Sequence, residues 1–224
     1  MKFYRRHWYE IGGIIAIGAI AYLVVFWNQM DILVRVLLMS FIAILLHQYE
    51  EYGFPGGEPA IMNMALQNSD IPDRYPLNQN SAMATNVICA LIYLLPVFLP
   101  HVIWLGLAPM LMGIMQFIVH GIATNIKMKS IYNPGLGAVV FLHFPIGIYY
   151  IWYIVSNGLV QATDWILAIL YLAFIAGGIV NGLTYKVLAN RNSKYPFDQV
   201  EMERFHVKEK LEKLSASSMV GPMN

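Results

Sequence analysis

One short stretch of the chain carries residues that can do chemistry inside apolar surroundings. His47 is followed three and four positions later by Glu50 and Glu51. If the stretch is helical, both carboxylates lie one turn beyond the imidazole and on its side, because residues three and four apart share a helix face. Imidazole nitrogen and carboxylate oxygen together suit zinc or iron, and the same pair can transfer protons without a metal. We therefore predict that His47, Glu50 and Glu51 are catalytic residues.

The elements that carry these residues are predicted to lie in a membrane. Of the 224 residues, 58% are hydrophobic and 12% are charged, about half the charged share of a soluble domain. This composition excludes an ordinary cytosolic enzyme and a disordered chain. The net charge of +1 gives no reason to propose nucleic acid as a partner. The single cysteine, Cys89, excludes an intrachain disulfide and a cysteine-based zinc site. The expected fold class is an all-α integral membrane protein, whose partner is the lipid bilayer.

Six apolar segments are near the length that crosses a bilayer as a helix. They run over Ile11–Trp27, Ile32–Tyr49, Ala82–Pro100, Val102–Asn125, Leu136–Val155 and Trp165–Tyr185. The third and fourth segments meet at Leu99-Pro100-His101 and are expected to form a tight hairpin. The first segment has a basic start and an Ala19-Ile20-Ala21 that looks like a signal-peptide cleavage site. Because apolar residues continue to Trp27, we expect a retained span.

The positions of the basic residues predict the orientation of these spans. With six spans, all 14 Lys and Arg residues except Arg35 fall on the same side of the membrane. Basic loops face the cytoplasm, so we expect both termini to be cytoplasmic. Residues 1–190 are then a six-span domain and residues 191–224 a cytoplasmic tail. In the tail, Asp198 and Glu201 predict a helix cap. The apolar stripe that follows predicts a short amphipathic helix, and it consists of Val200, Val207, Leu211 and Leu214.

Polar residues of five spans lie at a similar depth, if depth is measured from the cytoplasmic end of each helix. At about 1.5 Å per residue, each of these residues lies about 8–12 Å from the cytoplasmic end of its span. They are His47, Asn86, His120, His143 and Asn181. Thr124 and Asn125 share a face with His120 and lie nearer the surface. Because buried polar groups are costly in a bilayer, we expect one polar site formed by spans two to six and open toward the cytoplasm. Each residue taken alone can instead simply bond a neighbouring helix.

These residues also resemble a known family. His47-x-x-Glu50-Glu51 is followed by Tyr52-Gly53-Phe54-Pro55-Gly56-Gly57, and later by Tyr75-Pro76-Leu77-Asn78, Asn86, His120 and Tyr132-Asn133-Pro134-Gly135. From about Leu45 to Phe144, this pattern is similar to the HXXEE family of bacterial membrane proteins, which is named for its motif and has no established biochemical role. The resemblance implies a multi-pass protein of the bacterial inner membrane. It supplies candidate residues and no reaction.

The leading hypothesis is a membrane-embedded, metal-dependent hydrolase that acts on a lipid-like or otherwise apolar substrate. The expected cofactor is a divalent metal, with zinc as the first choice, and its candidate ligands are His47, Glu50, Glu51, His120 and His143. Glu51 is either the general base or a further ligand. The candidate groups for orienting ligands or binding a polar head are Asn86, Thr124, Asn125 and Asn181. Water activated by the metal would be the nucleophile.

Two alternatives remain open at this point. The first is a metal-free isomerase or cyclase, in which His47 and Glu50 move protons on an apolar substrate. The second is non-catalytic, a small transporter or a structural membrane subunit, because polar chains also build ion paths. Against transport, the sequence shows no internal repeat, and the half of the spans away from the polar layer is almost purely apolar.

Overall fold

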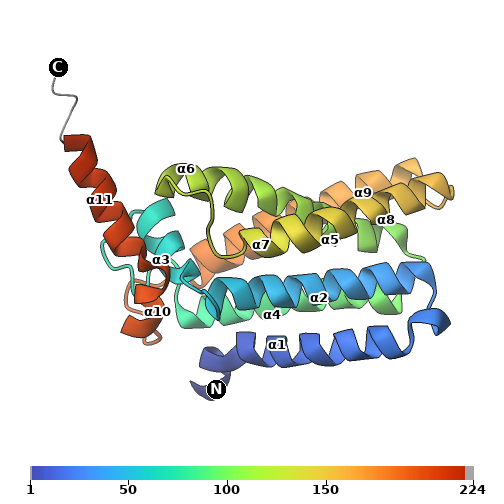
Figure 1. Cartoon of the computed structure of the whole chain (residues 1–224), viewed down its shortest axis with the longest axis horizontal. Coiled ribbons are helices and arrows are strands. Elements are labelled where there is room, and N and C mark those ends of the chain that lie inside the picture. Colours follow the sequence, from blue (N-terminus) through green and yellow to red (C-terminus); the bar gives the residue numbers. More distant parts are fainter. Residues whose placement is uncertain (1, 220–224) are drawn as a thin grey trace.

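The computed structural model describes residues 2–219 as a bundle of long helices that run side by side (Figure 1). Six of them are long and apolar enough to cross a membrane: α1 (Lys2–Val25), α2 (Ile32–Tyr52), α4 (Gln79–Phe98) and the continuous runs Ile103–Met128, Leu136–Ser156 and Ala162–Val187. No strand occurs in the described part of the chain. The predicted fold class, an all-α membrane protein with six spans, is confirmed.

The last three spans are not uniform α-helices. The fourth is α5 (Ile103–Phe117), η3 (Ile118–Thr124) and α6 (Asn125–Met128); the fifth is α7 (Leu136–Ala138), η4 (Val139–His143) and α8 (Phe144–Ser156); the sixth is α9 (Ala162–Ala173) and η5 (Phe174–Val187). The segments η3, η4 and η5 are π-helical. A π-helical stretch widens the turn and is frequent at functional sites. Each of these stretches contains at least one of the predicted polar residues.

The span boundaries differ from the predicted ones mainly at the start of the chain. Helix α1 begins at Lys2 rather than at Ile11, so the basic N-terminal residues belong to the helix. The short helix η1 (Trp27–Gln29) and the capping residue Asp31 then connect α1 to α2. The predicted tight hairpin is confirmed, because only residues 99–102 separate α4 from α5.

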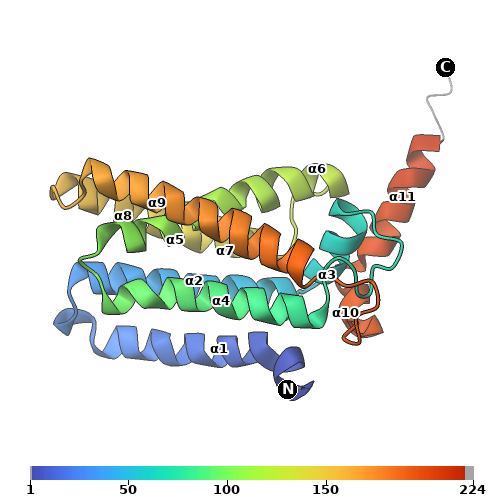
Figure 2. The same ribbon diagram turned by 180° about the vertical axis from the view of Figure 1, so that it is seen from behind.

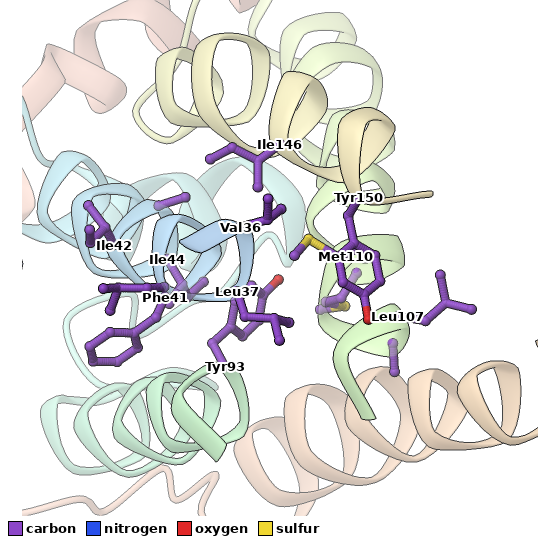
Figure 3. Close-up of a cluster of buried hydrophobic side chains, with 14 of the residues drawn as sticks. Val36, Leu37, Phe41, Ile42, Ile44, Tyr93, Leu107, Met110, Ile146 and Tyr150 are labelled. Carbon is purple, nitrogen blue, oxygen red and sulfur yellow. The ribbon is translucent and has the colours of Figure 1, made fainter. Parts of the chain in front are cut away.

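Helix α2 is the centre of the bundle. It lies between α1 and α4 on one side and α7 and α8 on the other (Figures 1 and 2). In its most apolar window 67% of the residues are buried, against 11% in the last span. Leu37 and Ile44 of α2 meet Tyr93, Leu107 and other apolar side chains of the neighbouring helices (Figure 3). A helix that is apolar on all sides is expected to be buried in this way, and its position brings His47 into the interior.

One end of the bundle carries nearly all the irregular structure, and we call it the tail end. Helices α3 (Glu58–Ala60), η2 (Ile61–Leu66), α10 (Gln199–Glu203), η6 (Arg204–His206) and α11 (Val207–Met219) gather there, beside the start of α1 (Figures 1 and 2). The Arg204 side chain donates a hydrogen bond to the backbone carbonyl of Tyr52 and so holds the tail against the end of α2.

The tail helix differs from its prediction in continuity. The cap formed by Asp198 and Glu201 is confirmed. However, Phe205 has a φ of 61°, outside the range of a right-handed helix, and the chain is kinked at this residue between α10 and α11. The predicted single stripe is therefore wrong: Val200 on α10 is exposed, whereas Val207 on α11 is fully buried against the η2 segment.

Candidate metal site

Three side chains from two spans meet in the interior near the tail end. They are His47 and Glu51 of α2 and His120 of η3, and each offers a ligand atom within 4.8 Å of the other two. Oε1 of Glu51 lies 3.2 Å from Nε2 of His47 and 3.3 Å from Nε2 of His120. All three residues are buried, with exposed fractions of 1%, 8% and 2% for His47, Glu51 and His120. We call these residues the His–Glu–His cluster.

The spacing along α2 explains why only one of the two adjacent glutamates joins the cluster. An α-helix turns about 100° per residue. Relative to His47, Glu51 therefore lies about 40° to one side and Glu50 about 60° to the other. This difference is enough for the two carboxylates to meet different neighbours: Glu51 faces η3, and Glu50 faces α7. The structure thus brings two of the three predicted catalytic residues together and places Glu50 outside the cluster.

Glu50 is an anchor for the start of the fifth span. Its carboxylate accepts hydrogen bonds from the Tyr132 hydroxyl (2.8 Å), the Gly137 N–H (3.0 Å) and the Ala138 N–H (2.7 Å). The two N–H groups belong to the first turn of α7, where they have no partner within the helix. Burial and the bond to Glu50 raise the pKa of Tyr132, so its hydroxyl keeps the proton that it donates. Glu50 therefore caps α7 from another span.

A turn between the fourth and fifth spans orients His120. Asn133 Oδ1 lies 2.8 Å from Nδ1 of His120, while Asn133 Nδ2 donates to the His120 backbone carbonyl (2.6 Å) and to Oδ1 of Asn125 (2.7 Å). If Nδ1 carries the proton, the lone pair of Nε2 faces Glu51. Gly135, with a φ of 98°, lies against the ring, and a Cβ there would be 2.6 Å from Cε1 of His120. The turn is thus shaped around the imidazole.

His143 lies beside the cluster without joining it. Its ring centroid is 5.3 Å from that of His47 and 5.9 Å from that of Tyr93. Within residues 2–219, neither Nε2 of His143 nor the Tyr93 hydroxyl has a hydrogen-bond partner, although both atoms are buried. Both nitrogens of His47 are likewise buried without a hydrogen bond. Unpaired buried polar atoms are rare in proteins and call for an explanation.

A cavity of about 240 Å³ adjoins the cluster. The polar residues on its wall include His47, Glu51, Glu58, Asn86, His120 and Asn181. The side chains of Asn86 and Asn181 donate to carbonyls of their own helices, those of Ala82 and Ala176. The remaining predicted head-binding residues, Thr124 and Asn125, lie next to His120 on its helix, and among the described residues they are not part of this wall.

Glu58 is a buried acidic residue of this cavity that sequence reasoning missed. It is 6% exposed, and its Oε2 has no hydrogen-bond partner in the described part of the chain. Burial and the nearby Glu51 carboxylate raise the pKa of Glu58 well above its usual range. The only sequence signal was its position in the first turn of a helix, directly after Gly56-Gly57 and before Pro59. That signal predicts a helix start and says nothing about a cavity.

Comparison with known proteins identifies the family. Neither a curated protein nor a solved structure shows significant similarity to this chain. A family model described as "Protein of unknown function with HXXEE motif" matches residues 38–150, which is half of the chain and includes the whole His–Glu–His cluster. The chain therefore belongs to the HXXEE family of proteins of unknown function.

Proposed function

We propose that this protein is a membrane-embedded, metal-dependent hydrolase whose substrate is lipid-like. The single observation that carries the proposal is the buried His–Glu–His cluster on the wall of a cavity. We further propose that its cofactor is one divalent metal ion, with zinc as the expected ion, held by His47, Glu51 and His120. Glu50 is not in this ligand set, because its carboxylate is already used at the start of α7.

The donor set and its spacing support zinc. Two imidazoles and one carboxylate are a known ligand set of catalytic zinc sites, in which a fourth position stays open. Ligand atoms about 2.1 Å from a tetrahedral ion lie about 3.4 Å apart, close to the 3.2 and 3.3 Å separations found here. A cation between these atoms would also balance the buried Glu51 charge. Bound zinc supplies Lewis acidity, which lowers the pKa of water to near neutrality.

The cavity supports a lipid-like substrate by its size and its lining. A volume of about 240 Å³ is below the roughly 300–1,000 Å³ of pockets that enclose a drug-sized ligand. A lipid-like substrate is therefore proposed to place its reacting group in the cavity and to leave its apolar remainder outside it. Asn86 and Asn181 on the wall are proposed to bind the polar part. Glu58, with one unpaired oxygen at the same wall, is proposed to exchange a proton during the reaction.

We also propose the bacterial inner membrane as the location, with both termini in the cytoplasm. Every Lys and Arg residue except Arg35 belongs to segments on one side of a six-span arrangement, and such segments face the cytoplasm. The tail end, with the site, would then face the cytoplasm. Residues 191–224 would be a cytoplasmic tail that packs on this end through Arg204 and Val207.

The reaction is tested with the purified chain in vesicles of a bacterial polar lipid extract, followed by mass spectrometry of the lipids. We expect hydrolysis products that fall by about 100-fold or more after treatment with a zinc chelator, because a metal contributes several kcal/mol to transition-state stabilisation. Added zinc should restore the rate. Glu51→Gln should be as inactive as the chelated protein, and His101→Ala, in the α4–α5 hairpin, should be fully active.

Two results would argue against this reaction. The absence of a product from every lipid class contradicts the lipid-like substrate. A rate that survives the chelator and is lost in Glu51→Gln contradicts the metal and favours metal-free acid–base chemistry at the same residues.

Asn133 gives a more specific prediction about the site. Groups that hydrogen-bond a metal-binding histidine fix its orientation, and their loss costs about 10–100-fold in metal affinity. We expect this reduction for Asn133→Ala in a zinc competition titration, because Asn133 is the partner of Nδ1 of His120. Asn86→Ala is the matched control, since the Asn86 amide donates to the Ala82 carbonyl of its own helix. Equal zinc affinities for the two variants would show that Asn133 does not position His120.

A further inference from the structure

A second cavity lies on the seam between α2 and the fifth span, and it extends inward from the end of the bundle opposite the tail end. It has a volume of about 440 Å³, and its wall is almost entirely apolar. Val36 of α2 and Ile146 of α8 point toward each other there (Figure 3). Its other lining residues include Met39, Leu142 and Phe141, the last of which is 77% exposed. We call this cavity the seam groove. Along α2, its Arg35 lies about 18 Å from His47.

Arg35 is the charged residue of the seam groove. Its guanidinium carbon lies 5.0 Å from the centroid of the Trp27 ring, and its Nε is buried without a hydrogen bond. Between residues 2 and 219, the structure gives Arg35 no ion pair with any carboxylate. Asp31 is one turn away on the same helix, but its Oδ1 is used to cap the N–H of Leu33 at 2.8 Å. Arg35 thus brings a positive charge and free donors to an apolar groove.

The position of Arg35 matches the level of lipid headgroups. It belongs to the first turn of α2, directly after the connection between α1 and α2. Trp27 and Tyr149, which also line the groove, are the residue types that favour the membrane interface. From Tyr149 inward to Phe141 the groove follows about 12 Å of helix, at about 1.5 Å per residue. One end of the groove is therefore cationic and interfacial, and the rest is apolar and lies at the depth of acyl chains.

These features point to one occupant. We propose that the seam groove binds a single phospholipid molecule, whose phosphate accepts hydrogen bonds from Arg35 and whose acyl chain lies against Met39 and Leu142. Arginine is well suited to this contact, because its planar guanidinium donates two parallel bonds to a phosphate. Arg35 lies about 18 Å along α2 from His47, so the proposed phosphate contact is separate from the His–Glu–His cluster and does not depend on the proposed reaction.

Native mass spectrometry of the full chain in detergent tests the site. With dioleoylphosphatidylglycerol as the probe, we expect one bound lipid per chain. Arg35→Gln should weaken binding about tenfold or more, because it removes the charge and the paired donors. Arg35→Lys keeps the positive charge but not the two parallel donors, so it should weaken lipid binding less than Arg35→Gln does. Met39→Trp should block the groove, whereas Leu91→Trp, which fills an apolar groove without a cation between α4 and Tyr171, should bind like the unmodified chain.

Two partial probes separate the contributions of phosphate and acyl chain. Diolein carries the chains without the phosphate, and glycerol 3-phosphate carries the phosphate without the chains. Each should bind at least about tenfold more weakly than the intact lipid. Unchanged binding in Arg35→Gln, equal losses in Met39→Trp and Leu91→Trp, or equal affinity for diolein would each overturn the proposal. If Met39→Trp fails to fold, as a thermal melt would show, the comparison of Arg35→Gln with Arg35→Lys decides.

Discussion

Zinc is expected to raise the free energy of unfolding of the unmodified chain by about 4 kcal/mol when free zinc is about 1,000 times the dissociation constant. The same zinc concentration should leave the free energy of unfolding of His120→Ala unchanged. The reason is linkage: an ion that binds only the folded state adds its binding free energy to the free energy of unfolding. His120→Ala removes one of three ligands and the contact with Glu51. Glu51→Gln should also lose the effect, because an amide is a far poorer zinc ligand than a carboxylate. Thermal unfolding in zinc buffers measures the difference.

The control for this prediction is a histidine outside the cluster. His101→Ala changes a residue in the turn between α4 and α5, which lies at the other end of the bundle from the site. It should be stabilised by zinc as strongly as the unmodified chain. Equal stabilisation of His120→Ala and the unmodified chain would show that zinc binds elsewhere. In that case the cluster is a hydrogen-bonding group without a metal.

The second large effect is expected at the neighbouring glutamate. Glu50→Gln should lower the free energy of unfolding by about 3 kcal/mol, because hydrogen bonds to charged groups contribute about 1.5–3 kcal/mol each. The carboxylate accepts three donors, from Tyr132, Gly137 and Ala138. A glutamine presents an NH₂ group to one of these donors and leaves it unpaired. Denaturant unfolding in detergent gives the value, and Tyr132→Phe, which removes one of the three bonds, should cost about 1.5 kcal/mol.

The variants Glu50→Gln and Glu51→Gln should therefore differ in which property they lose. Glu50→Gln is expected to lose stability and to keep its zinc affinity within a few fold. Glu51→Gln is expected to lose zinc binding, so that its unfolding free energy no longer depends on zinc. A chain in which Glu50→Gln loses zinc while its unfolding free energy is unchanged would place Glu50 among the ligands, contrary to the ligand set proposed above.

Local sequence rules predict much of the fold. The six spans follow from length and apolar composition, and the cap of α10 follows from Asp198 and Glu201. The break at Phe205 was missed because it depends on tertiary contacts: Val207 is buried against η2, and Arg204 is bonded to the end of α2. A periodic pattern within the tail contains no information about these partners.

The sequence predicts those residues of the site whose positions follow from helical spacing or from a common depth in the membrane. His47 and Glu51 are related by helical spacing, and His120 lies at a matching depth. The different role of Glu50 was not predictable, because it depends on which neighbour each side of α2 meets. Asn133 and Glu58 lie in connections between spans, where depth gives no position. The π-helical stretches that carry His120 and His143 also leave no signal in a one-dimensional pattern.

The central claim is that His47, Glu51 and His120 bind one zinc ion, and X-ray absorption at the zinc edge tests it most directly. For purified chain loaded with one equivalent of zinc, we predict two imidazole nitrogens and oxygen ligands at about 2.0–2.2 Å. The His120→Ala chain should retain no zinc after dialysis. An unmodified chain that retains no zinc after the same dialysis, or a His120→Ala chain that retains zinc with two imidazoles, would contradict the claim.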